Sequence, residues 1–280
     1  RLSFLDCQKI AIEALARDGE VLIRKLKKED SPFGFQIQFL EADHLDEDLN
    51  KHNPKTGNEI KMGVEVDKYD KPVAYHLYKN HPFDRTYMNE NEHIVVPADE
   101  IIHLYMPTRP EQTRGVTNIA TVMANVKQLN AYLEAEIVAA RVASSKMGFF
   151  TSPDGDGYVG DSEEIDGNPV QTANAGTFEQ LPAGVSFQSF DPQHPTSAFE
   201  GFTSSVLRSI ASGLNISYHA LSNDLTSVNY SSIRQGSLED RSSYQLWQQF
   251  MIEHMIEHIF KDWLEMAIAN NYLNLPYTQI

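Results

Sequence analysis

The most informative stretch of the sequence for the fold is residues 213–236, GLNISYHALSNDLTSVNYSSIRQG. Glycine commonly ends a helix, so one helix is expected to close at Gly213. A short helical turn and a polar loop follow, and a long helix is expected to begin at Tyr230. The stretch contains no constellation of residues that is typical of catalysis. It therefore predicts two helices joined by a polar loop.

Long helices are expected on both sides of this loop. Ser197 and Glu200 form a capping box that predicts the start of the helix ending at Gly213. Apolar residues also recur at helical spacing over residues 117–145 and again over residues 231–270. The earlier stripe comprises Ile119, Val122, Val126, Leu129, Leu133 and Ile137. Helices of this length with one apolar stripe need packing partners along their length.

The first 110 residues predict one helix followed by antiparallel strands. Ser3 is a good N-cap and Gly19 a good stop, so a helix is expected over residues 3–17. Apolar and polar residues then alternate with the period of two that half-buried strands show. The strands expected on this basis are 33–39, 60–66, 73–77, 93–96 and 101–106, with turns at 53–57 and 67–72. Strands followed by long helices predict the α+β class.

Residues 152–195 are rich in Gly, Pro, Asp and Asn, and we expect a small, loop-rich subdomain inserted between helices. Within it, Asp154-Gly-Asp156-Gly is superficially similar to a calcium loop. The EF-hand pattern requires a further acidic or amide ligand and then glycine, where this chain has Tyr158 and Val159. A solvent-exposed turn is the favoured interpretation.

The composition limits the classes of function. The chain has 280 residues, a formal net charge of −16 and a pI near 5.0. A domain that clamps nucleic acid is usually basic, so this charge argues against one, although it allows a surface past which DNA moves without sticking. Cys7 is the only cysteine, which excludes an intrachain disulfide and a cysteine-based zinc site. No apolar run approaches membrane-spanning length, and no membrane partner is expected.

One motif points to an enzyme. His254, Glu257 and His258 match the H-x-x-E-H pattern in which two histidines bind zinc and a glutamate acts as base. A helical projection places all three on a solvated face, opposite an apolar stripe. A catalytic zinc would also need a third ligand, and only a short stretch of the sequence follows the motif. The stripe comprises Ile252, Met255, Ile256, Ile259, Trp263 and Met266. A surface histidine pair is favoured, and a cytosolic zinc-dependent hydrolase is the alternative.

Other signatures of catalysis are missing from the sequence, which contains no G-x-S-x-G elbow, P-loop or G-x-G-x-x-G. Arg109 and Arg114 precede the first long helix, and we interpret them as turn residues that pair with nearby acids in preference to a phosphate site. No catalytic residue, cofactor or metal is therefore expected.

Several segments together resemble the lambda family of bacteriophage portal proteins. They are QTRGV at 112–116, IASGL at 210–214, NYSS at 229–232 with Arg234, and the hairpin at 63–75. The resemblance covers essentially the whole chain and is strongest over residues 109–143 and 199–235. None of these segments is a catalytic signature, but their order and spacing together are specific.

The resemblance implies a portal fold with a β-rich wing, long stem and wing helices, and a small inserted clip subdomain. By this resemblance, residues 1–116 are the wing, 117–148 lead into the stem, 149–195 are the clip, 196–216 are the second stem helix, 217–231 hold the tunnel loop, 232–272 are the long wing helix, and 273–280 begin the crown. The family's N-terminal arm and much of its crown are missing, so we expect a piece of a longer chain. The segment 155–174 matches the family poorly.

The resemblance also implies a structural, non-enzymatic role. Portal subunits of phages and prophages form a ring, dodecameric in the virion, at one vertex of the capsid. Double-stranded DNA passes through the ring without sequence specificity, during packaging by terminase and during ejection. The partners implied are terminase large subunit, the head–tail connector, and the major capsid and scaffold proteins. The location implied is the virion, and the bacterial host cytoplasm during assembly.

The tunnel loop is the candidate site. Its residues expected at the DNA channel are Ser222, Asn223, Asp224, Leu225, Thr226, Ser227, Val228 and Asn229. The polar side chains suit short-lived contacts to phosphates, the two apolar ones add bulk, and Asp224 is the one charge and repels phosphate. We hypothesise a steric, weakly polar gasket. A ring-forming scaffold unrelated to DNA is a further alternative.

Overall fold

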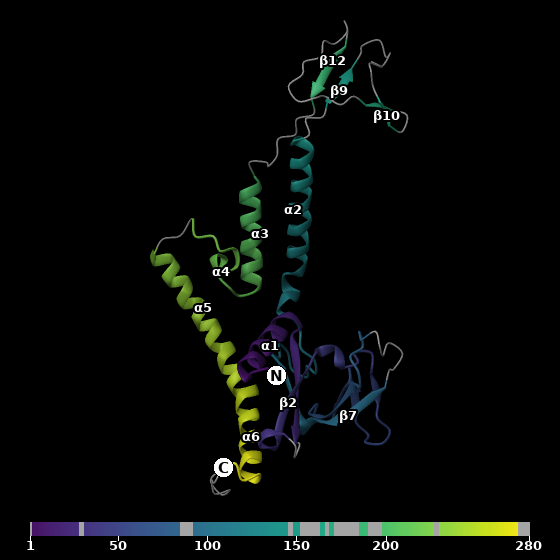
Figure 1. Ribbon diagram of the computed structural model, residues 1–280, viewed down its shortest axis with the longest axis vertical. Coiled ribbons are helices and arrows are strands. Elements are labelled where there is room, and N and C mark those ends of the chain that lie inside the picture. Colours follow the sequence, from purple (N-terminus) through teal and green to yellow (C-terminus); the bar gives the residue numbers. More distant parts are fainter. Residues whose placement is uncertain are drawn as a thin grey trace. The chain divides into compact units, whose positions relative to one another are not determined.

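The computed structural model describes residues 2–27, 31–84, 92–144, 148–151, 163–165, 168–170, 185–189, 198–226 and 230–273. The chain divides into two compact units. The first comprises Arg1–Met123 and Ala211–Ile280, and the second comprises Ala124–Ile210. Helices and antiparallel sheets are both present, which confirms the α+β class (Figure 1).

A three-stranded antiparallel sheet lies at the centre of the first unit. Its middle strand is β1 (Glu20–Lys27), with β2 (Phe35–Leu40) on one side and β8 (Ile101–Tyr105) on the other. Side chains of a strand point alternately to the two faces of a sheet. Val21 and Ile23 accordingly pack against helices, while Leu22 packs against a second sheet. The β1 strand therefore contributes to both hydrophobic cores.

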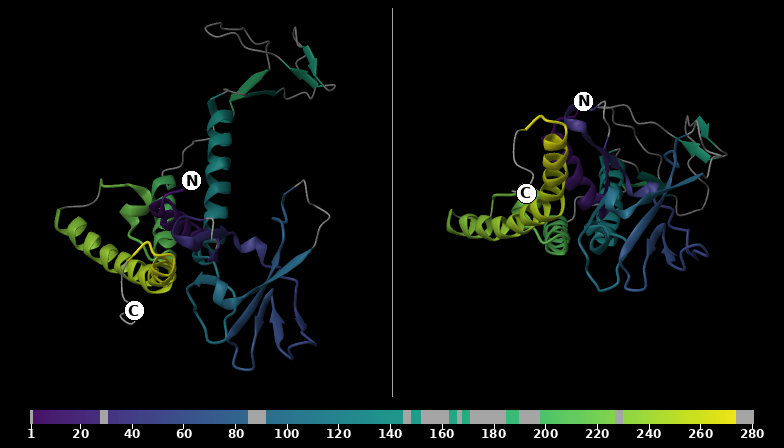
Figure 2. Two further views of the ribbon diagram at one scale, coloured as in Figure 1. Left: turned by 60° about the horizontal axis from the view of Figure 1, so that its bottom comes forward. Right: turned by 90° about the horizontal axis from the view of Figure 1, so that it is seen from below.

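The second sheet is an antiparallel meander in which each strand pairs with the next along the chain (Figure 2). Its strands are β3 (Lys51–His52), β4 (Glu59–Lys61), β5 (Val64–Val66), β6 (Pro72–Tyr78) and β7 (His93–Pro97). Short 3-10 turns border the strands, namely η1 (Pro32–Gly34), η2 (Ala42–His44) and η3 (Ala98–Glu100). The hairpin predicted across the turn at 67–72 is confirmed, and β5 and β6 form it. The single strand predicted over 60–66 is wrong, because Met62 and Gly63, with φ of 49° and 82°, form a turn that divides it into β4 and β5, which pair with each other.

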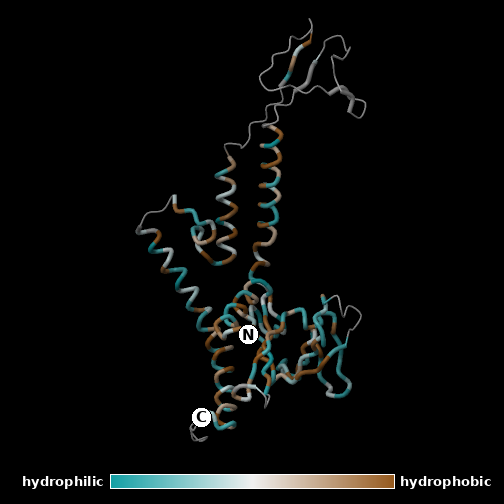
Figure 3. The backbone as a smooth tube through the Cα atoms, viewed as in Figure 1, coloured by the Kyte–Doolittle hydropathy of each residue, from teal (hydrophilic) through white to brown (hydrophobic). Residues whose placement is uncertain are grey.

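Helices cover the other face of the three-stranded sheet. They are α1 (Phe4–Arg17) and a long helix made of α5 (Tyr230–Met251), the π-helical turn η5 (Ile252–Ile256) and α6 (Glu257–Ala269). Ser3 caps α1 as predicted, in a reciprocal pair with Asp6. The shared core includes Leu15, Ile23, Leu104, Met255 and Ile259. Hydropathy along the long helix agrees with this packing. Figure 3 shows that α5 is largely hydrophilic, whereas α6, which packs on the core, carries hydrophobic bands.

In the second unit, α2 (Met123–Ser144) runs beside α3 (Phe199–Gly213), whose last residues belong to the first unit. The Tyr132 ring stacks on Phe199 with centroids 5.9 Å apart and meets Phe202 edge-on at 4.8 Å. Two strand pairs also belong to this unit: β9 (Gly148–Thr151) with β12 (Ser186–Ser189), and β10 (Glu163–Ile165) with β11 (Asn168–Val170). Helix α2 is preceded by the 3-10 turn η4 (Asn118–Thr121). The helix predicted over residues 117–145 is thus confirmed from Met123 onward, whereas its expected first turn is the separate 3-10 turn η4.

Further details of the strand and helix predictions were wrong or incomplete. Strand β1 was not predicted, although it is the central strand. Phe33 lies in η1 with φ of 62°, and the following strand begins two residues later, at Phe35. Ile252, assigned to the buried stripe, is 46% exposed because a π-helical turn adds a residue and rotates the helix surface.

Other predictions fall outside the described residues. The capping residue Ser197 and the calcium-like motif at Asp154 are among these, as is most of the segment 152–184. Within the part of the chain that the structure describes, no helix is both long and apolar enough to cross a membrane.

Candidate functional site

The stretch 213–236 folds as two helices joined through a short third one. Helix α3 ends at Gly213, and α4 (Tyr218–Ser222) follows after a bend in which Asn215 has a left-handed φ of 56°. Asn223 ends α4 with φ of 54°. Asparagine tolerates this conformation better than most residues, which suits both bends. The predicted helix–loop–helix is confirmed.

Five of the eight predicted loop residues lie in the described part, and three of them are brought together. The Asp224 carboxylate accepts hydrogen bonds from the Thr226 amide at 3.0 Å and the Thr226 hydroxyl at 2.6 Å. It also accepts one from the Tyr218 hydroxyl at 3.2 Å. The Asp224 amide in turn donates to the Ser222 hydroxyl at 3.2 Å. The loop's one charge is therefore engaged in holding the loop's own backbone.

The remaining loop residues point elsewhere or are not described. Leu225 is 55% exposed, and Asn223 is exposed as well. The last three predicted residues, Ser227, Val228 and Asn229, lie outside the described residues. The loop thus presents an apolar and an amide side chain to its surroundings, beside an inward-facing carboxylate.

Arg114, from the QTRGV segment, joins three parts of the first unit. Its Nε donates to the Glu20 carboxylate at 2.6 Å. Its terminal nitrogens donate to the backbone carbonyls of Met62 at 3.1 Å and Ala42 at 3.3 Å. The interpretation of Arg114 as a turn residue paired with an acid is confirmed. Among the described residues, Arg109 forms no ion pair.

Glu20 is 2% exposed and accepts from several donors at once. Besides Arg114, the His103 ring nitrogen Nε2 lies 3.0 Å away and the Gly115 amide donates at 2.6 Å. Burial raises the pKa of a carboxyl group, but the hydrogen bonds and charges of His103 and Arg114 outweigh it and lower the pKa of Glu20 to about 2. This carboxylate is therefore a structural anchor that stays charged at neutral pH.

Gly115 is required by its surroundings. A Cβ atom at this position would overlap the carbonyl oxygen of Gly19 and lie 2.6 Å from the Glu20 Cβ. Gly19 has φ of 89°, and a Cβ atom there would lie 2.3 Å from the carbonyl carbon of Val116. Two glycines therefore allow the end of α1 and the start of the α2 segment to meet backbone to backbone.

A second buried carboxylate, Glu65 on β5, holds the turn at 53–57. It is 3% exposed and accepts from Thr56 at 2.6 Å, and from the amides of Asn53 and Asn58 at 3.0 Å each. His76 Nε2 lies 2.9 Å away. Burial raises the pKa of this carboxyl group, but these four hydrogen bonds lower it to about 2. The predicted turn is thus fixed by side-chain bonds to the sheet.

The zinc-binding pattern does not form a ligand cluster. His254, Glu257 and His258 are all exposed. The two histidines line an open groove of about 420 Å³ beside β8, and the His254 ring packs on Phe250 with centroids 4.7 Å apart. Among the described residues, the one group of three potential ligands with all atoms within 4.8 Å of one another lies elsewhere.

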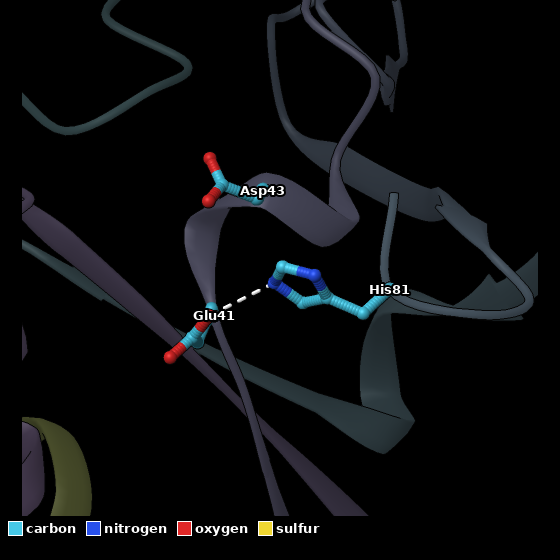
Figure 4. Close-up of side chains that lie close together, drawn as sticks. All are labelled: Glu41, Asp43 and His81. Carbon is cyan, nitrogen blue, oxygen red and sulfur yellow. Dashed lines mark hydrogen bonds and ion pairs between the residues drawn. The ribbon is translucent and has the colours of Figure 1, made fainter. Parts of the chain in front are cut away.

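That group is Glu41, Asp43 and His81 (Figure 4). Both ring nitrogens of His81 are already engaged, because Nε2 lies 2.9 Å from the Glu41 carboxylate and Nδ1 accepts from the Phe83 amide at 3.2 Å. An imidazole that accepts at Nδ1 and donates at Nε2 has no free lone pair for a metal. The contact between Glu41 and His81 therefore has a structural explanation, because it links the residue before η2 to the segment after β6.

Comparison with known proteins gives the family. A family model described as phage portal protein, lambda family, matches residues 1–248. The chain belongs to this family. The family is a structural one, and the comparisons give no support to a zinc-dependent hydrolase.

Individual portal proteins agree with this assignment. The probable portal protein of Halomonas phage phiHAP-1 is 36% identical over 283 residues, which cover 99% of this chain and 54% of that protein. Portal protein B of Escherichia phage lambda is 28% identical over 62% of this chain and 37% of its own length. The chain thus spans about half the length of the first of these portal relatives, and less of the second.

The chain also has weak similarity to chains in solved structures of a gene transfer agent particle. One from the neck of the native particle has a TM-score of 0.45 at 13% identity, covering 79% of this chain and 58% of that one. One from the native virion has a TM-score of 0.47 at 13% identity, and the match covers 90% of this chain and 64% of that one. The portal assignment rests on the family model and the sequence relatives.

Sequence reasoning missed the two anchoring carboxylates. Glu20 precedes the apolar run Val21-Leu22-Ile23, so an alternation reading of β1 would have placed it on the inward face beside Leu22. Glu65 lies between two buried valines of β5 and gave the opposite signal, because alternation assigns it to the solvated face. Its burial follows from the turn at 53–57, which covers it.

Proposed function

We propose that this chain is the subunit of a portal ring, dodecameric in the virion, at one vertex of a phage head. The ring is the conduit for double-stranded DNA during packaging and ejection, and it acts without sequence specificity. Terminase, the head–tail connector, and the capsid and scaffold proteins are its partners. The observation that carries the proposal is the match of the portal family model to residues 1–248. Assembly takes place in the bacterial host cytoplasm.

The proposed division of labour along the chain follows the portal fold. Residues 1–116 form the wing, 117–148 lead into the stem, 149–195 are the clip, 196–216 are the second stem helix, 217–231 hold the tunnel loop, 232–272 are the wing helix and 273–280 begin the crown. The two hydrophobic cores and the Glu20–Arg114 hydrogen bond support the wing assignment, because they pack α1 and the two sheets of residues 1–116 together. The clip is the proposed docking surface for terminase and connector.

The loop at 222–229 is proposed to line the narrowest part of the channel. A conduit for a polyanion must guide it without holding it, and a net charge of −16 disfavours lasting phosphate contacts. The described loop residues add no cation, and the Asp224 carboxylate is held by Tyr218 and Thr226. Leu225 and Asn223 remain to make the steric and weakly polar contacts of a gasket.

A pair of substitutions at Leu225 tests this role without disturbing the Asp224 hydrogen bonds. Leu225→Lys adds one phosphate-binding cation per subunit, so packaged DNA per head is expected to fall several-fold as the strand is retained in the channel. Leu225→Gln, polar but neutral, is expected to package normally. The amount of nuclease-protected DNA per head is the measurement.

Leu5→Lys is the matched control, because Leu5 is also well exposed, at 60%, but lies on α1. It adds the same charge to each subunit away from the loop and is expected to leave packaging unchanged. If Leu225→Lys and Leu5→Lys behave alike, the loop does not face the DNA.

A further inference from the structure

A carboxylate of α5 accepts two hydrogen bonds from the residue at the start of α4. The Asp240 side chain accepts from both the backbone amide of Ser217, at 3.1 Å, and its hydroxyl, at 2.6 Å. A serine at this helix-capping position usually uses its oxygen to accept a backbone amide from the first turn. Ser217 makes no such cap bond, and its hydroxyl is turned to Asp240 instead. The start of α4 is therefore held from the neighbouring helix rather than from within.

The same face of α5 makes two further contacts. Gly236, one turn before Asp240, leaves room for the His219 ring of α4, because a Cβ there would lie 2.8 Å from the His219 Cε1. The side-chain amide of Asn215 donates to the Ser243 hydroxyl at 3.4 Å. Positions 236, 240 and 243 follow the i, i+4, i+7 spacing of one helix face. The α4 segment thus rests along two turns of α5.

At its other end α4 holds the loop. The Tyr218 hydroxyl, on the first turn of α4, donates to the Asp224 carboxylate, which in turn accepts the Thr226 amide and hydroxyl. The Ser222 hydroxyl donates to the Tyr218 carbonyl at 2.8 Å. Hydrogen bonds at the two ends of α4 therefore connect α5, through Asp240 and Ser217, with the described part of the loop, through Tyr218 and Asp224.

We propose that Asp240 is the positioning residue for the tunnel loop: it fixes α4 on α5, so that the loop moves only as α5 moves. The role of the loop in the channel rests on the proposed portal function, whereas the positioning itself does not. Loss of the carboxylate removes two hydrogen bonds, one of them short and both to a charged acceptor, so α4 and the loop open locally more often.

Hydrogen exchange followed by mass spectrometry tests the positioning without DNA. In Asp240→Ala, peptides covering residues 218–226 are expected to exchange about tenfold faster or more, whereas peptides of α1 keep the native rate. Asp240→Asn keeps one acceptor and is expected to restore part of the protection. Ser217→Ala, which removes only the hydroxyl donor, is expected to give an intermediate effect.

The matched control is Glu239→Ala on the adjacent residue of α5. Glu239 is exposed and accepts from Gln235 of its own helix, at 3.0 Å. Its removal is expected to leave exchange over residues 218–226 at the native rate. Native exchange in Asp240→Ala, or equal acceleration in Asp240→Ala and Glu239→Ala, overturns the positioning role.

Packaging by the same variants then tests the channel separately. Faster exchange together with reduced DNA retention supports both the positioning role and the portal function of the loop. Faster exchange with normal packaging and retention supports the positioning role and counts against the loop as the channel constriction.

Discussion

The backbone amide of Gly115 donates a hydrogen bond to the carboxylate of Glu20, 95 residues earlier in the chain, at 2.6 Å. The bond closes the gap between the start of the central strand and the segment that leads into α2. Arg114 binds the same carboxylate from the adjacent position. The QTRGV segment therefore stabilises the first unit. Its hydrogen bonds join α1, both sheets and the segment that leads into α2.

Replacing Glu20 by Gln is expected to destabilise the protein strongly. The change leaves the Arg114 guanidinium half-paired in a buried site, and breaking a buried ion pair costs about 3–5 kcal/mol. The free energy of unfolding from chemical denaturation measures the loss. Glu100→Gln is the control, because Glu100 is 44% exposed and lies 3.5 Å from Arg24, so it should cost less than about 1 kcal/mol. Similar losses in the two variants contradict the anchoring role.

Gly115→Ala is expected to lower the melting temperature by disrupting the same contact. Its new methyl group overlaps the Gly19 backbone, which cannot retreat without moving α1 from β1. Gly201→Ala on α3 is the control, because its Cβ meets nothing within 4 Å and alanine favours a helix by about 0.5–1 kcal/mol. A melting curve should thus shift in opposite directions for the two alanines, and a neutral Gly115→Ala contradicts the close approach.

Acid is expected to unfold the first unit through its two buried carboxylates. The pKa values of Glu20 and Glu65 fall from an ordinary 4.5 to about 2 in the folded chain. Because the folded values are depressed, each group contributes stability that is fully present above 4.5 and is lost as the pH falls toward 2. The free energy of unfolding measured from pH 7 to 2 should decline mainly in this window.

Glu65→Gln should weaken that decline, because the variant has one fewer carboxylate that binds a proton on unfolding. Glu59→Gln on β4 is a control, since Glu59 is exposed. A pH profile of Glu65→Gln with the native slope between pH 4.5 and 2 contradicts the assignment of that slope to Glu65.

The histidine pair on η5 and α6 is expected to bind no zinc of its own. Both rings are exposed and form no cluster with a third ligand among the described residues. His254→Ala combined with His258→Ala should leave the melting temperature and DNA packaging close to native. Metal analysis of the purified native protein provides the direct check, and one tightly bound zinc per chain, lost in the double variant, supports the hydrolase alternative instead.

Local patterns predicted the elements whose signals are local. The cap at Ser3, the alternation in the hairpin and the helical stripe from Ile119 onward each depend on near neighbours, and the corresponding elements formed. The helix–loop–helix at 213–236 was also predicted from local signals, because Gly213 indicated the end of α3 and the polar residues after it indicated a loop.

Features that depend on contacts with distant residues could not be predicted from the sequence. Ile252 is exposed because a π-helical turn changes the helical phase, and apolar spacing alone does not reveal such a turn. Glu65 is buried because a turn from elsewhere covers it, and Asp240 gains its role only when α4 lies against α5. Periodicity cannot indicate either contact, since it describes one element at a time.

The central claim is that copies of this chain surround DNA with the loop at 222–229 nearest the axis. Electron microscopy of particles of the purified protein, averaged without imposed symmetry, tests it most directly. We expect closed rings with a central hole wide enough for double-stranded DNA and with the loop at its narrowest level. Isolated monomers, or rings in which the loop lies on the outer surface, would contradict it.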